Sequence, residues 1–116
     1  MNKQEILRIL EKIYDPEHPV SVVEMGIVEE DDIEIGEKVR VRFKPTSPFC
    51  PMGALIGVVI KYGLEKALNQ EVDVEVKPGT HVNESMVNSM MKDRKRYEEI
   101  INRLISSGQM ERFVKL

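Results

Sequence analysis

The chain of 116 residues is poor in cysteine, in aromatic residues and in charge of one sign. Its one cysteine, Cys50, excludes an intrachain disulfide and a four-cysteine metal site within a single chain. There is no Trp, and 17 basic against 20 acidic residues give a net charge of -3. These values argue against a protein that binds nucleic acid by neutralising phosphates or by stacking bases.

Long hydrophobic runs are also missing. The longest, Met52–Ile60, is interrupted by two glycines and is far shorter than the about 20 apolar residues that cross a bilayer. The first ten residues carry charges where a secretion signal has an apolar core. We therefore expect a cytoplasmic protein with no membrane partner.

Hydrophobic periodicity predicts the order helix, two strands, helix, strand, helix. Apolar residues recur at helical spacing near the N-terminus, in the middle and near the C-terminus, and at alternate positions in between. The expected helices span 3–14, 51–68 and 84–107, and the expected strands span 33–35, 39–44 and 71–77.

These elements predict an α+β fold. A small three-stranded sheet packs against a central helix, with an N-terminal helix and a long C-terminal helix. The chain shows no internal repeat and no linker, so we expect a single domain over 1–116 with a C-terminal helical extension over 84–107.

Cys50 is the candidate residue with the greatest chemical reactivity. It precedes Pro51, the expected first residue of the central helix, where free N–H groups and the helix dipole favour a thiolate. Thr46 and Ser47 add hydroxyl groups beside it. The alternatives are an ordinary buried cysteine and hydroxyls that only cap a turn.

The two histidines, His18 and His81, both lie at predicted turns. A lone histidine at a surface turn commonly has no function. If folding brings either of them to Cys50, a thiolate, an imidazole and a carboxylate make a mixed transition-metal site.

Three motifs resemble the PaaD/SufT-like (MIP-type) family of iron–sulfur cluster assembly proteins. They are the segments 15–20 (Asp-Pro-Glu-His-Pro-Val), 44–52 (Lys-Pro-Thr-Ser-Pro-Phe-Cys-Pro-Met) and 78–88, which begins Pro-Gly-Thr-His. They occur in the family's order, and the third resembles the branch of cytosolic iron–sulfur targeting subunits.

The resemblance implies an adaptor, not an enzyme, that helps to insert clusters into cytosolic apo-proteins. Its partners would be apo-proteins and assembly or carrier proteins. It gives the functional role to Cys50 and a supporting role to residues that cluster around the cysteine: Asp15, Glu17, Thr46 and Ser47. It also implies metal binding at His81 and homodimers that include domain-swapped forms. Together with the mixed-site argument, the candidate metal ligands are Cys50, His81 and His18. The cofactor stays open between a transient iron–sulfur cluster and a single transition metal.

Two alternatives belong to other classes. One is an interaction module in which the cysteine is incidental, since a three-stranded sheet has two exposed edges that favour pairing between chains. The other is a thiol-dependent enzyme in which His81 acts as a base toward Cys50, which requires the two side chains to be within hydrogen-bond reach.

Overall fold

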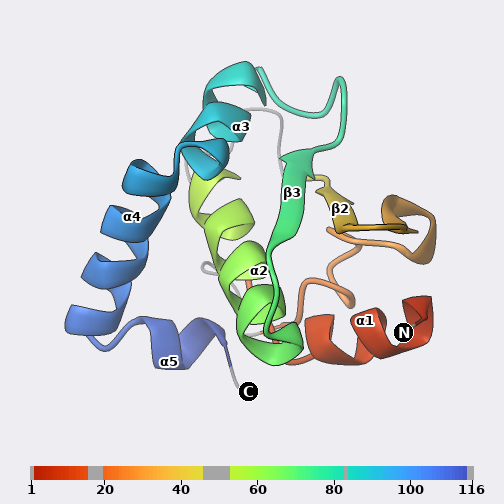
Figure 1. Ribbon diagram of the computed structural model, residues 1–116, viewed down its shortest axis with the longest axis horizontal. Coiled ribbons are helices and arrows are strands. Elements are labelled where there is room, and N and C mark those ends of the chain that lie inside the picture. The colour runs from red at the N-terminus through yellow and green to blue at the C-terminus, as the bar shows by residue number, and fades with distance from the viewer. Residues whose placement is uncertain (1, 16–19, 46–52, 83, 115–116) are drawn as a thin grey trace.

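The computed structural model describes residues 2–15, 20–45, 53–82 and 84–114. Three strands form one sheet in the order β1-β2-β3, and helices cover it (Figure 1). The elements, in chain order, are α1 (Lys3–Leu10), the 3₁₀ turn η1 (Glu30–Asp32), β1 (Ile33–Ile35), β2 (Val39–Phe43), α2 (Gly53–Leu68), β3 (Val72–Val76), α3 (Glu84–Lys92), α4 (Arg94–Ser106) and α5 (Met110–Phe113). The predicted α+β class is confirmed.

The sheet is mixed. β1 and β2 pair antiparallel, with Glu34 opposite Arg40, and this is the hairpin that the alternating sequence predicts. β2 and β3 pair parallel, with Val41 opposite Val74. Parallel neighbours need a crossover connection, and α2 supplies it.

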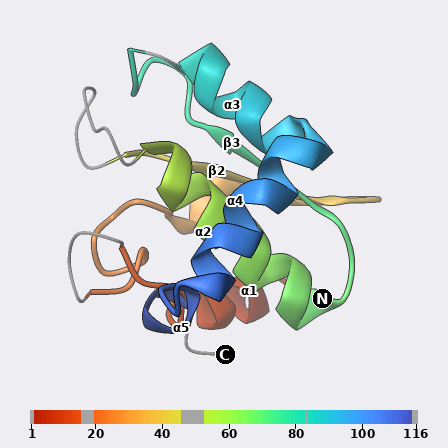
Figure 2. The ribbon, with the colours of Figure 1, turned by 90° about the vertical axis from the view of Figure 1, so that its left-hand side faces the viewer.

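The core lies between the sheet and α2. Figure 2 shows the sheet nearly edge-on, with α2 and α1 on one side, while α3 lies beside β3 and also contacts α2. Alternate strand residues point to α2, which is apolar nearly all round because sheet and helices surround it. The buried residues include Val39, Val41, Phe43, Val72, Val74 and Val76 from the strands and Ile56, Val59, Ile60 and Leu64 from α2.

The other sheet face is charged, as the alternation predicts. Arg42 contacts Glu34 at 3.4 Å and Glu75 at 3.1 Å, so one cation joins all three strands. Lys38 contacts Asp73 at 3.4 Å. Cross-strand pairs of opposite charge favour this register.

The C-terminal segment differs in detail from the single long helix that its periodicity predicts. Asp93 takes extended angles (ψ 103°), and its carboxylate accepts from the N–H of Lys95 at 3.1 Å. It therefore begins a second helix, α4, directly after α3 ends at Lys92. None of the helices in the described ranges is both long and apolar enough to cross a membrane.

Candidate functional site

The carboxyl ends of β2 and β3 lie side by side at one edge of the sheet, which we call the carboxyl edge. Phe43 is opposite Val76, and the N–H of Lys77 donates to the carbonyl of Phe43 at 2.8 Å. The first turn of α2 lies at the same end of the molecule as the end of β3 (Figure 1). The segment that holds Cys50 therefore leaves and re-enters the described structure at this edge, which is where ligands bind in many folds with parallel strands.

An ion pair between a buried carboxylate and a half-exposed lysine spans the end of β2. Asp32, which precedes β1, is 6% exposed, and it contacts the ammonium of Lys77 at 3.0 Å. Its other carboxylate oxygen accepts from the N–H of Glu29 at 3.0 Å. The hydrogen bond and charge of Asp32 raise the pKa of Lys77 above its ordinary value. The pair ties the two flanking strands together beside the start of the 44–52 segment.

His81 lies in a tight turn after β3. The hydroxyl of Thr80 donates to the carbonyl of Lys77 at 2.6 Å, and the N–H of Gly79 donates to the carboxylate of Glu84 at 3.0 Å. Gly79 has φ +80°, which a side chain would strain. These contacts hold His81, which is partly exposed, just beyond the carboxyl edge.

Asp15 is the other candidate in the described part of the chain. It is 3% exposed, and its N–H donates to the carbonyl of Val20 at 3.0 Å. The preceding Tyr14 donates its N–H to Phe113 of α5. The hydroxyl of Ser21 accepts from the N–H of Glu24 at 3.2 Å and caps the turn that follows.

The remaining candidates lie outside the described residues: Cys50, Thr46, Ser47, Glu17 and His18. Their clustering around Cys50, a metal site with His81 and a Cys50–His81 pair in a thiol enzyme all stay predictions. Within the described ranges, no group of three or more His, Cys, Asp or Glu side chains is arranged to hold a metal ion.

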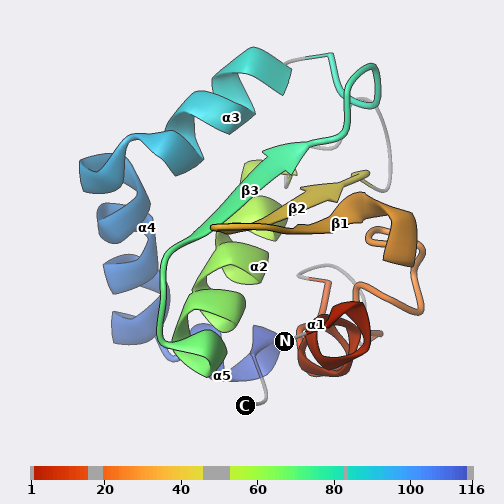
Figure 3. The same cartoon turned by 45° about the vertical axis from the view of Figure 1, so that its right-hand side comes forward.

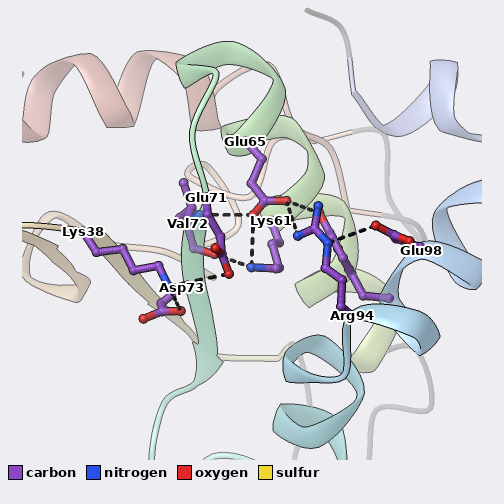
Figure 4. A network of polar contacts seen from close by, with 9 residues as sticks. Lys38, Lys61, Glu65, Glu71, Val72, Asp73, Arg94 and Glu98 are labelled. Carbon is purple, nitrogen blue, oxygen red and sulfur yellow. Dashed lines mark hydrogen bonds and ion pairs between the residues drawn. The ribbon is translucent and has the colours of Figure 1, made fainter.

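A second polar cluster, away from the carboxyl edge, was not predicted. Figure 4 shows Lys61 and Glu65 reaching from α2 to Val72 on β3. Lys61 donates to the Val72 carbonyl and pairs with Glu65 at 3.2 Å, while Glu65 accepts from the N–H of Val72 at 3.1 Å. The hydroxyl of Tyr97, on α4, donates to Glu65 at 2.8 Å, and Arg94 lies 3.7 Å from the same carboxylate.

The Lys61–Glu65 pair at the centre of this network is almost dry, whereas Arg94 is exposed. Lys61 is 5% exposed, and its ammonium lies 5.2 Å from the centre of the Tyr97 ring. Burial, followed by the hydrogen bond to Glu65, raises the pKa of Tyr97 well above its ordinary value, so the phenol stays neutral. A Lys and a Glu four apart in an otherwise apolar helix were the available sequence signal.

These features define a class: a small α+β domain with a strand–helix–strand unit and a candidate site where its parallel strands end. The family model described as iron–sulfur cluster assembly protein matches residues 3–77. The chain is 41% identical to a MIP18 family protein of Schizosaccharomyces pombe, 37% to the MIP18 family protein galla-2 of Drosophila melanogaster and 35% to cytosolic iron-sulfur assembly component 2B of Mus musculus.

The alignments cover 83%, 91% and 92% of this chain and 58%, 77% and 74% of those relatives, in the same order. The chain thus spans little more than half the length of the Schizosaccharomyces pombe protein. It belongs to the MIP18 family of iron–sulfur cluster assembly proteins, as the three motifs indicated.

Proposed function

We propose that this protein is an assembly and targeting factor that helps to insert iron–sulfur clusters into cytosolic apo-proteins, and that it is not itself an enzyme. The observation that supports this most is the match of the family model over residues 3–77, together with relatives named for cytosolic iron–sulfur assembly. In this proposal the iron–sulfur cluster is the cargo, and the partners are apo-proteins and assembly or carrier proteins.

Cys50 is the working residue of the proposal. A single thiolate suits brief ligation and handover, since a stored cluster needs several cysteines. The described chain before the 46–52 segment supports this role, because the N–H of Lys44 donates to the carbonyl of Ile27 at 2.8 Å. This fixed point limits where the segment can be presented to a partner.

The remaining site assignments follow the same logic. Asp15, Glu17, Thr46 and Ser47 support Cys50 with oxygen atoms, and His81 is the candidate second ligand for a metal. Dimer formation, including exchange of elements between chains, belongs to the same proposal.

The test is cluster insertion into an iron–sulfur apo-enzyme whose activity reports its cluster. The wild-type chain is compared with Cys50→Ala and with Ser106→Ala, a control on the exposed end of α4. We expect the wild-type chain to accelerate cluster insertion, Cys50→Ala to abolish this acceleration and Ser106→Ala to keep it. Equal acceleration by Cys50→Ala would contradict the role of the sulfur but leave family membership intact.

A direct binding experiment separates this proposal from the interaction-module alternative. If Cys50→Ala still binds the apo-enzyme and no longer matures it, the cysteine acts in transfer. If it binds and matures the apo-enzyme as well as the wild type does, the chain is an interaction module.

A further inference from the structure

The outer edge of β3 is the free edge of the sheet next to α3 (Figure 3). Because Lys77 donates to Phe43, the odd-numbered residues of β3 bond to β2. The N–H and carbonyl groups of Val72, Val74 and Val76 therefore point away from the sheet. An edge of this kind is a template for another strand unless something covers it.

Side chains cover both ends of this edge. At Val72, Lys61 and Glu65 take the hydrogen bonds that a neighbouring strand would take. At Val76, the side-chain oxygen of Asn88 on α3 accepts the N–H at 2.7 Å. Both ends of β3 are thus paired with helix side chains.

The middle of the edge is different. Among the hydrogen bonds of the described residues, none uses the outward N–H or carbonyl of Val74. A cavity of about 190 Å³ lies beside Val74, between β3 and the junction of α3 and α4, and its lining includes Lys61, Met91, Lys92 and Arg94. The helices therefore cover this position without filling the space of a paired strand.

Apolar and polar contacts together hold the cover, because Val87 and Met91 of α3 and Leu104 of α4 are buried in the core. Tyr97 ties α4 to Glu65, and Asn88 ties α3 to Val76. If α3 and α4 move away, Asn88 leaves with them, and Lys61 and Glu65 can turn to water. The cavity beside Val74 leaves this cover imperfectly packed, and helices near the end of a chain can open locally before the rest of the core unfolds.

We propose that the outer edge of β3 is a strand-pairing site, covered by α3 and α4 in the closed molecule, that accepts an extended segment of a partner protein with alternating apolar and basic residues. The site does not involve Cys50, so it goes beyond the proposed function. Strand addition is an established mode of peptide recognition.

Charge selects the partner. The side chains of Glu71, Asp73 and Glu75 lie on the solvent side of β3. A second copy paired antiparallel about Val74 would place Asp73 opposite the copy's Glu75, twice, and like charges directly opposite destabilise a pair. Basic side chains at those positions complement the acids, and apolar ones between them match the valines.

The test uses the full chain and hydrogen exchange of individual amides by nuclear magnetic resonance. The probe is a capped five-residue peptide of alternating lysine and valine, and its control has glutamate in place of lysine. We expect the Val74 amide to exchange through local opening, faster than that of Val41 in the sheet centre. We expect the basic peptide to slow this exchange at Val74 and the acidic peptide to leave it unchanged.

Tyr97→Phe sharpens the test, because it removes the hydrogen bond to Glu65 without leaving a buried charge unpaired. Losing one such bond increases the open population about fivefold, so the basic peptide should bind about fivefold more tightly. Glu98→Gln, which alters only the exposed pair with Arg94, is the matched control and should bind like the wild type.

Three results would overturn the proposal. One is that the Val74 amide exchanges its hydrogen only through global unfolding and that the basic peptide does not slow this exchange. Another is equal binding of the basic and acidic peptides, or binding that leaves Val74 unprotected. The third is concentration-dependent self-association that protects Val74, because the occupant would then be a second copy.

Discussion

One ion pair lies at the carboxyl edge of the sheet, and another of nearly equal length lies at the outer edge of β3. Their surroundings differ. At the carboxyl edge, Asp32 and Lys77 lie 3.0 Å apart, and the lysine side chain is 43% exposed. At the outer edge, Lys61 and Glu65 lie 3.2 Å apart, with side chains 6% and 14% exposed. Burial, not distance, decides what each pair contributes, because water screens the first and is excluded from the second.

The difference in burial between the two ion pairs corresponds to different roles of the two edges. The carboxyl edge keeps the hydrated cation of Lys77 beside the end of β2, which suits the cargo transfer that we propose for Cys50. At the outer edge the Lys61–Glu65 pair is buried beneath the helices, and it serves structure until α3 and α4 open. The following predictions test this contrast, from the largest expected effect to the smallest.

Glu65→Leu should give the largest loss of stability. It leaves the ammonium of Lys61 buried without an anion, which costs about 3–5 kcal/mol when one partner of a buried pair is removed. Urea unfolding followed by circular dichroism measures the change.

The double variant Lys61→Met, Glu65→Leu is the control for that experiment. An apolar replacement of a buried pair is often neutral or stabilising, so most of the loss should be recovered. A double variant as unstable as Glu65→Leu would show that the pair's hydrogen bonds to Val72, and not the unpaired charge, dominate.

Gly57→Ala should have an intermediate effect, because this glycine lies where α3 and the end of β2 meet α2. A Cβ there would overlap the sulfur of Met91 and lie 2.9 Å from the ring of Phe43. Overpacking costs about 1–3 kcal/mol, and the better helix propensity of alanine returns up to about 1 kcal/mol. Gly36→Ala, where a Cβ meets nothing within 4 Å, should change the free energy of unfolding little.

Asp32→Ala should have a smaller effect on stability. It removes the acceptor for the Glu29 N–H at the start of η1, a cap worth about 1 kcal/mol. The freed Lys77 remains hydrated, so no buried charge is stranded. A loss as large as that of Glu65→Leu would contradict the contrast between the edges.

The smallest effect should be a dependence on alkaline pH. Burial raises the pKa of Tyr97 above the ordinary value of about 10 for a phenol, so folding favours the neutral form. This contribution is fully present below about pH 10 and is lost as the pH rises toward the folded-state pKa. The stability of Tyr97→Phe should therefore fall less steeply than that of the wild type above that pH, as measured by urea unfolding at a series of alkaline pH values.

Local patterns predicted the elements well because their causes are local. Strict alternation over 39–43 and 72–76 marks strands with one buried face, and the structure confirms both. The break at Asp93 was missed because helical periodicity continues through it, although Asp is a good helix cap.

The polar network could not be predicted, because it depends on contacts far apart in the sequence. Glu65 and Tyr97 are separated by 32 positions, and only the packing of α4 on α2 buries Lys61. The roles of Cys50 and its neighbours rest on motif resemblance, which family membership supports and the described contacts leave as predictions.

The most direct measurement of the central claim is an anaerobic titration of the full chain with ferrous iron, followed by amide chemical shifts. We predict that shifts gather at Lys44, Lys77 and His81 on the carboxyl edge, that Val72 and Val74 stay unchanged, and that Cys50→Ala removes the effect. Shifts that persist in Cys50→Ala, or that gather at the outer edge of β3, would contradict the account.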